Sequence, residues 1–268
     1  MIEKLLEDIG LKSSTCLEFG AWDGKHLSNT WTLWAERGWD AVLIEADRHR
    51  FELLKKCTEN KPNVMCLCAQ VGTDPESSLD QILAQSQHNM DVGVLSIDID
   101  GDDYIIWEST ALKAAIVVIE YNASFPPEIT YVAKPGTHSG SSAAAFIALA
   151  ERKGYDFVDL TKTNLLFIRS DLTERLTVER LALIDAFDRD LLPVVYSDIY
   201  GIHRLLRPAQ WGFSGFRAEI GLSAITGRSR HSLVRSAKWL ARMNVPVISS
   251  SLRHGANWFA YRSLKKNP

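Results

Sequence analysis

The sequence predicts an α/β fold built on a mostly parallel β-sheet. Short apolar runs alternate with helical patterns through the first two-thirds of the 268 residues, and the alternation closes with a β-hairpin. Parallel strands are connected by helices, whereas a tight turn joins antiparallel strands. Five β/α units followed by a hairpin are more specific than a generic doubly wound sheet.

The expected strands are short apolar runs rich in β-branched residues. They lie at Ser14–Phe19, Trp39–Glu45, Val64–Ala69, Val92–Ile97 and Ala115–Glu120. Helices are expected between them at Ser28–Gly38, His49–Asn60, Ser78–Ser86 and Tyr104–Leu112. Ser28 opens a run of capping residues and Gly38 suits a helix end, which supports the first of these helices.

A loop rich in Pro, Gly and Ser follows the fifth strand at Asn122–Ser142. An alanine-rich helix is expected next, at Ala143–Lys153, and Gly154 suits its end. The closing hairpin then pairs Tyr155–Leu160 with Leu165–Arg169.

Charge is divided unevenly along the chain. Residues 1–200 hold 18 Lys/Arg and 32 Asp/Glu, whereas residues 201–268 hold 12 Lys/Arg and a single acid. The pattern also becomes mainly helical after the hairpin. We therefore expect an α/β domain over residues 1–172 and a helical, basic C-terminal extension over residues 173–268.

The extension contains a basic amphipathic segment at residues 228–243. We expect a helix there that packs on the α/β domain with its basic face in solvent. The alternative is that residues 201–268 contact an anionic glycan, a lipid carrier or membrane headgroups. Nucleic acid is disfavoured as a partner, because the first domain is strongly acidic and no stacking module is present.

Composition, the N-terminal segment and the cysteines indicate the class of protein and the compartment in which we expect it. The chain is 46% hydrophobic and 24% charged, and no apolar run approaches the ~20 residues of a membrane span. The N-terminus lacks the basic start and apolar run of a secretory signal. We expect a cytoplasmic protein, with peripheral membrane contact as the alternative. Its four cysteines are expected to be reduced, and Cys66 and Cys68 are too close for a zinc knuckle.

The first candidate site is the turn Glu18-Phe-Gly20-Ala-Trp-Asp23-Gly24, after the first strand. Its glycines let the backbone approach a ligand at the start of a helix. Glu18 would repel a pyrophosphate but accept hydrogen bonds from an ammonium group, such as the methionine part of S-adenosylmethionine. Glu45 ends the second strand, where an acid can bind both ribose hydroxyls. Together these residues predict a nucleoside-type cofactor.

A second candidate site is acidic. Asp98 and Asp100 follow the fourth strand and share a side if that strand continues, as do Glu120 and Asn122 after the fifth. The carboxyl ends of neighbouring parallel strands meet at one edge of the sheet. We therefore expect these four residues to converge as oxygen ligands for Mg²⁺, Mn²⁺ or Ca²⁺, with Mg²⁺ or Mn²⁺ as the cofactor. A solvated acidic turn is the alternative.

Two of the seven histidines lie where ligands are expected, His26 in the glycine turn and His138 in the loop after the fifth strand. Imidazole titrates near neutrality, so either could act as a general base. Of the two, we take His138 as the catalytic candidate. A surface position is the alternative for both histidines.

These motifs, in this order over about residues 14–171, resemble the class I S-adenosylmethionine-dependent methyltransferases, in particular the FkbM-like group. The residues that carry the resemblance are Glu18–Gly24, Leu27–Thr30, Gly38–Trp39, Ile44–Glu45, Ser96–Gly101, Val118–Asn122 and Lys153–Tyr155. It implies a Rossmann-like sheet that is mostly parallel with an antiparallel last strand. The family's common second glycine is replaced by Trp22, and the fifth strand ends in Glu-Tyr-Asn where paired aspartates are common.

The resemblance also implies a binding site for S-adenosyl-L-methionine. Its expected residues are Glu18, Gly20, Ala21, Asp23, Gly24, Ser28, Asn29, Glu45 and Ala46. Asp98 would border the methyl-transfer site. Residues 100–110 are similar to metal-dependent sugar O-methyltransferases, which place acids around a magnesium ion.

We therefore expect an S-adenosylmethionine-dependent O-methyltransferase, assisted by a divalent metal, that acts on a hydroxyl of a sugar, a glycan or a related small natural product. One rival is a metal-dependent glycosyltransferase that uses Asp98-Ile-Asp100 as its D-x-D motif. The other is a non-catalytic protein with a degenerate cofactor pocket. The sequence leaves the acceptor, the general base and the oligomeric state open.

Overall fold

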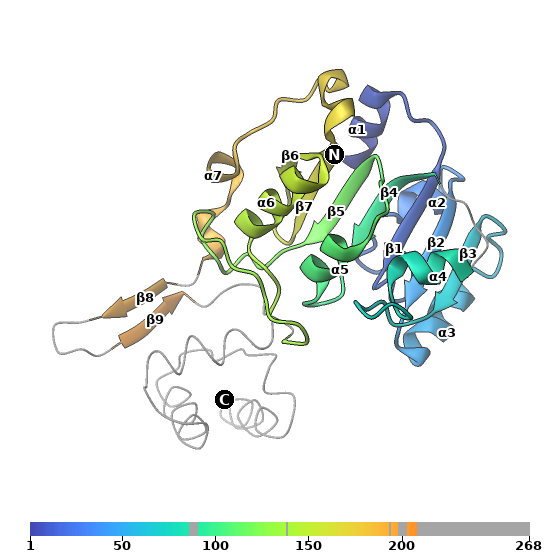
Figure 1. Cartoon of the computed structure of the whole chain (residues 1–268), viewed down its shortest axis with the longest axis horizontal. Helices are drawn as coiled ribbons and strands as arrows, with labels where there is room; N and C mark the ends of the chain where they lie inside the picture. Colours follow the sequence, from blue (N-terminus) through green and yellow to red (C-terminus); the bar gives the residue numbers. More distant parts are fainter. Residues whose placement is uncertain (86–90, 138, 193, 198–202, 208–268) are drawn as a thin grey trace, which may run out of the picture.

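The computed structural model describes residues 1–85, 91–137, 139–192, 194–197 and 203–207 of the chain. Its centre is a seven-stranded sheet in the order β3-β2-β1-β4-β5-β7-β6 (Figure 1). The strands are β1 (Thr15–Phe19), β2 (Asp40–Glu45), β3 (Val64–Cys68), β4 (Val92–Ile97), β5 (Ile116–Glu120), β6 (Tyr155–Leu160) and β7 (Asn164–Arg169).

Strands β1 to β5 are parallel, and β7 lies antiparallel between β5 and β6. This arrangement is the Rossmann-like methyltransferase sheet, which confirms the predicted fold class. Strand β1 is central, because β2 and β4 pair with its two edges and the chain order reverses there. Ligands of such sheets bind beyond the carboxyl ends of the strands at that reversal.

Helices cover both faces of the sheet (Figure 1). Successive side chains of a strand point to opposite faces, so Leu17 and Phe19 belong to one buried cluster and Cys16 to the other. The cluster of Leu17 is closed by α4 (Leu79–Gln85), α5 (Asp103–Ser109) and α6 (Ala143–Lys153). The opposite cluster is closed by α1 (Ile2–Ile9), α2 (Trp31–Ala35) and α3 (Arg48–Cys57). Burial on both faces explains why most side chains of the parallel strands are apolar, whichever face of the sheet they point to.

Helix α2 is shorter than the predicted helix over Ser28–Gly38, and it begins at Trp31. The capping residues ahead of it have other partners. The Ser28 hydroxyl and the Asn29 backbone N–H both donate to the Glu18 carboxylate. These two donors are therefore satisfied by Glu18 on β1, and the helix begins after them.

The chain beyond β7 is less helical than predicted, as far as the structure describes it. It contains the short turns η1 (Ser170–Arg175), α7 (Leu183–Ala186) and η2 (Arg189–Leu191). These are followed by an antiparallel pair, β8 (Val194–Ser197) and β9 (His203–Arg207). Val194 and Val195 are β-branched, which favours strand over helix. The predicted basic helix at residues 228–243 lies outside the described residues.

Among the described residues, no helix combines the length and the apolar character needed to cross a bilayer.

Trp107 is the centre of the larger core cluster. Its fully buried ring lies 5.1 Å from Phe167, 5.7 Å from Tyr155 and 6.4 Å from Phe146, measured between ring centroids. Its indole N–H has no hydrogen-bond partner. The side chain therefore contributes through packing and not through its polar group.

We predict that Trp107→Ala lowers the free energy of unfolding by about 3–5 kcal/mol, because it leaves a large cavity. Trp107→Phe should cost no more than about 1.5 kcal/mol, since it keeps most of the ring contacts and removes an unpaired donor. Urea denaturation of both variants measures the difference. Equal costs for the two substitutions would contradict the packing role.

Candidate functional site

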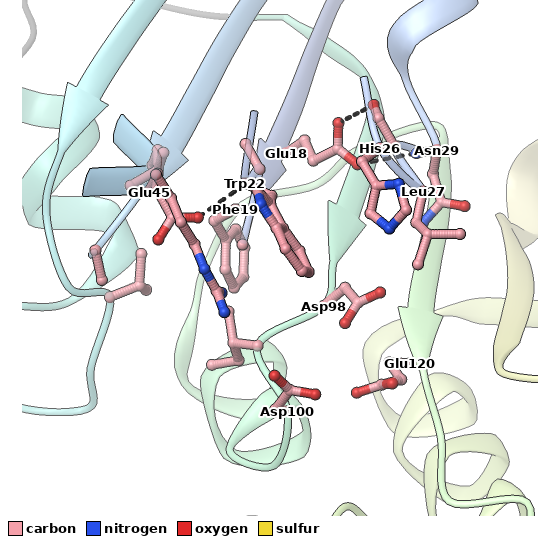
Figure 2. A pocket seen from close by; sticks show the side chains of 18 of the residues that line it. Glu18, Phe19, Trp22, His26, Leu27, Asn29, Glu45, Asp98, Asp100 and Glu120 are labelled. Atoms are coloured by element: carbon pink, nitrogen blue, oxygen red, sulfur yellow. Dashed lines mark hydrogen bonds between the residues drawn. The ribbon is translucent and has the colours of Figure 1, made fainter. Parts of the chain in front are cut away.

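A cavity of about 730 Å³ lies at the carboxyl ends of the parallel strands. It brings together most of the residues that the sequence singles out, from both candidate sites (Figure 2). The predicted residues that line it are Glu18, Gly20, Ala21, Ser28, Asn29, Glu45, Ala46, Asp98, Asp100 and Glu120. The glycine turn and the acidic residues therefore belong to one site.

Gly20 makes that arrangement physically feasible. It adopts a left-handed φ of 79°, and a Cβ placed on it would lie 1.7 Å from the carbonyl oxygen of Asp98. Only glycine tolerates both the conformation and the close contact. The turn after β1 can therefore close directly against the end of β4.

Glu18 is a buried hub of this region, with 4% of its surface exposed. One carboxylate oxygen accepts hydrogen bonds from Ser28 Oγ at 2.6 Å and Thr30 Oγ1 at 2.7 Å. The other accepts from the Asn29 N–H at 2.9 Å and Ser96 Oγ at 3.4 Å. Burial raises the pKa of Glu18, and these hydrogen bonds oppose that shift. Glu18 thus ties the loop before α2 to β1 and β4, in place of the direct bond to a ligand ammonium that the sequence suggests.

Glu45, the last residue of β2, fixes the backbone of the glycine turn at Trp22. Its carboxylate accepts from the backbone N–H of Trp22 at 2.8 Å and of Asp47 at 2.7 Å. Each oxygen keeps a second lone pair, so the side chain can still accept from a ligand hydroxyl. It lies well away from the acidic residues at the far end of the cavity (Figure 2).

Trp22 forms an aromatic wall that the sequence did not assign to the site. The Arg50 guanidinium lies 4.3 Å from its ring centroid, and the His26 ring meets it edge-on at 5.1 Å. All three residues line the cavity. Trp22 holds φ at 50°, which is rare for a bulky residue. The replacement of the usual glycine by Trp22 is the signal that could have revealed this wall.

The acidic end of the cavity is compact. Carboxylate oxygens of Asp98, Asp100 and Glu120 all lie within 4.8 Å of one another. The loop that carries the two aspartates is shaped by the buried Asp103, which accepts from the N–H groups of Ile99 and Gly101 at 2.9 Å each. Figure 2 shows the three side chains grouped below Glu18.

The carboxyl groups at the acidic end have raised pKa values. For Asp98 and Glu120, burial is the largest cause and the charges of neighbouring carboxylates add to it. Burial raises the pKa of Asp98 to about 7, with further increases from the nearby charges of Asp103, Asp100 and Glu18. Burial likewise raises the pKa of Asp103 to about 6, and that of Glu120 well above its usual value. These acids favour protonation unless something else supplies positive charge.

Two predicted residues of the glycine turn do not line the cavity. Asp23 accepts from the N–H groups of Lys25 and His26, so it shapes the turn. Gly24 packs against α3, where an added Cβ would lie 2.7 Å from Leu54 Cδ1. Both were predicted to bind the cofactor, and in this structure they shape the turn that carries the lining residues Gly20 to Trp22.

Asn122 was predicted as a metal ligand, but its side chain has other partners in this structure. Its side chain is fully buried, where its amide donates to the Ser139 carbonyl at 2.5 Å and its oxygen accepts from the Ser124 N–H at 2.8 Å. Strand β5 ends at Glu120, so the alternation of side chains does not extend to Asn122. His138, the predicted base, lies outside the described residues, whereas His26 lines the cavity.

The sequence predicts the hairpin turn between β6 and β7, but it does not predict that this turn belongs to the site. Residues 161–164 line the cavity beside Glu120. Asn164 begins β7 and is the register partner of Glu120. No spacing rule links two residues that lie so far apart along the chain.

No protein-family model matches the chain, and no curated protein does. Similar solved structures include a TehB-like SAM-dependent methyltransferase from Corynebacterium glutamicum, with 11% sequence identity and a TM-score of 0.38. The match covers 63% of this chain and 86% of that chain. A SAM-dependent methyltransferase from Aquifex aeolicus has 14% identity, 62% and 87% coverage, and a TM-score of 0.38.

TrmK from M. capricolum, in complex with S-adenosyl-homocysteine, has 10% identity, 97% and 95% coverage, and a TM-score of 0.39. The first two of these three neighbours are SAM-dependent methyltransferases. At these TM-scores the likeness adds nothing to the fold assignment, which rests on the strand order and the antiparallel β7.

We predict that Gly20→Ala lowers the free energy of unfolding by at least about 3 kcal/mol, from backbone strain and the clash with Asp98 together. Gly10→Ala is the matched control, since Gly10 has a similar φ of 74° and open space around it. It should cost only about 1–2 kcal/mol. Urea unfolding compares the two, and a Gly20→Ala protein as stable as Gly10→Ala would show that the close contact is absent.

Proposed function

We propose that this chain is an S-adenosylmethionine-dependent O-methyltransferase, assisted by a divalent cation, whose acceptor is a hydroxyl of a sugar, a glycan or a related small natural product. The observation that carries the proposal is the shared cavity. Glu45 lies at one end, three clustered carboxylates lie at the other, and the glycine turn contacts both through Trp22 and Gly20. A cofactor and an acceptor bound at the two ends would meet in the middle.

The cofactor end suits an adenosine. Glu45 retains acceptor capacity for two ribose hydroxyls, and bonds of this kind to a carboxylate are worth about 1.5–3 kcal/mol. The closed turn at Gly20 and Ala21 leaves backbone close to the ligand. Glu18 acts here as a positioning residue, because its oxygens are committed to Ser28, Asn29, Thr30 and Ser96.

The acidic end suits a hard divalent cation. The donor atoms are all oxygens, and one of them, Glu120 Oε2, is buried without any hydrogen-bond partner. A buried acceptor without a donor is costly unless a ligand satisfies it. Oxygen donors at this spacing select Mg²⁺ or Mn²⁺ over softer metals. When bound, such a cation would orient an acceptor hydroxyl and lower its pKa.

In the reaction, the sulfonium methyl moves to the acceptor oxygen as the carbon–sulfur bond breaks, and S-adenosylhomocysteine leaves. The chain contributes chiefly by alignment, which can supply about 7–11 kcal/mol of the barrier reduction. Trp22 and Phe19 line the cavity and limit access of water. The hydroxyl proton passes to a base, for which His138 and His26 are the candidates.

The test is calorimetric titration with S-adenosylhomocysteine, with a UDP-sugar for comparison, in Mg²⁺ and again in EDTA. We expect micromolar binding of S-adenosylhomocysteine that Glu45→Ala weakens at least tenfold, because two charge-assisted hydrogen bonds are lost. Glu52→Ala is the matched control, since Glu52 lies on α3 and pairs with Lys55 on the surface. That variant should bind as the wild type does.

The other outcomes separate the rivals. Metal-dependent UDP-sugar binding without S-adenosylhomocysteine binding would replace the proposal with a glycosyltransferase that uses Asp98 and Asp100. S-adenosylhomocysteine binding without methyl transfer to any of a panel of polyhydroxylated acceptors would support a non-catalytic cofactor-binding protein.

A further inference from the structure

We propose that Asn164 supplies the fourth protein oxygen of the cation site, alongside Asp98, Asp100 and Glu120. This inference rests on the cation-assisted part of the proposed function and adds a ligand that comes from a different part of the fold. It replaces Asn122, whose side chain is occupied elsewhere.

The main observation is a pair of unsatisfied oxygens. In the described part of the chain, four buried side-chain polar atoms have no hydrogen-bond partner, and only two of these are oxygens. They are Glu120 Oε2 and Asn164 Oδ1. Buried acceptors without donors are rare in proteins and call for a partner outside the chain. Two such atoms on residues that line one cavity point to a shared ligand.

The topology brings these two residues side by side. Glu120 ends β5 and Asn164 begins β7, and they are register partners in the antiparallel pair. Directly opposed residues of such a pair present their side chains to the same face, with Cβ atoms about 4.5–5.5 Å apart. Glu120 in turn lies with Asp98 and Asp100, whose carboxylate oxygens are within 4.8 Å of its own (Figure 2).

The amide of Asn164 is held in place by its own turn. Its Nδ2 donates to Thr163 Oγ1 at 3.3 Å, which directs Oδ1 away from Thr163. The backbone is fixed on both sides, since its N–H donates to Thr161 Oγ1 at 2.9 Å and its carbonyl accepts from the Thr161 N–H at 2.7 Å. The oxygen is therefore positioned before any ligand arrives, which favours binding.

The three carboxylates and the Asn164 amide oxygen together favour a bound cation. Three carboxylates and one amide oxygen, with no sulfur or imidazole among them, match the donors that Mg²⁺ and Mn²⁺ prefer. A substrate hydroxyl could donate to one orphaned oxygen, but a single hydroxyl proton cannot satisfy two acceptors. The hydroxyl alternative is one of the outcomes of the test.

The experiment measures Mn²⁺ binding to the full chain in the absence of cofactor, by the loss of the free-Mn²⁺ electron paramagnetic resonance signal. Asn164→Ala should raise the Kd at least tenfold. Asn164→Asp should bind within about threefold of wild type or more tightly, because it keeps an oxygen and adds charge. Gln70→Ala is the matched control, since Gln70 is an amide that lines the same cavity beyond β3. Urea unfolding of each variant verifies that it is folded.

An Asn164→Ala protein that binds Mn²⁺ like the wild type would overturn the assignment, and so would an Asn164→Asp protein that binds as weakly as Asn164→Ala. If Asn164→Ala instead weakened only a polyol acceptor, the hydroxyl would be the partner. Titration with S-adenosylhomocysteine in EDTA tests cofactor binding separately from cation binding. A wild-type chain that binds this ligand but no Mn²⁺ contradicts the cation site and leaves the cofactor proposal standing.

Discussion

The close contact between Gly20 and the carbonyl oxygen of Asp98 is the constraint on which the site depends. A side chain at position 20 would force the turn after β1 away from the end of β4. The glycine turn and the acidic loop would then face different spaces. Glu18 reinforces the same junction, because it accepts hydrogen bonds from the loop before α2 and from Ser96 on β4. Backbone proximity and one buried carboxylate together build the cavity.

The two ends of the cavity differ in how their charge is balanced. Glu45 accepts from two backbone N–H groups, which offset its charge locally. At the other end, carboxylate oxygens within 4.8 Å of one another would repel by about 3.5 kcal/mol per ionised pair at an effective dielectric constant of about 20. The fold keeps these three carboxyl groups together at the carboxyl edge of the sheet. A bound cation would attract all three carboxylates and offset their mutual repulsion. For this reason a cation-assisted reaction fits the site.

The sequence predicts the framework well where local and global signals agree. Strand β4 and helix α6 match their expected bounds, because β4 is a mostly apolar run and α6 lies between the capping residue Ser142 and Gly154. The predictions fail where tertiary contacts decide. Asn122 was placed by strand alternation, but the strand ends two residues earlier. Asn164 was missed because only the antiparallel pairing of β7 with β5 brings it beside Glu120.

The most direct test of the central claim is a crystal structure grown with S-adenosylhomocysteine and Mn²⁺, with anomalous data collected at the manganese edge. We expect the adenosine against Glu45 and an anomalous peak about 2.1–2.3 Å from oxygens of Asp98, Asp100, Glu120 and Asn164. A structure in which S-adenosylhomocysteine is absent from the cavity, or in which no anomalous peak lies among these oxygens, would contradict it.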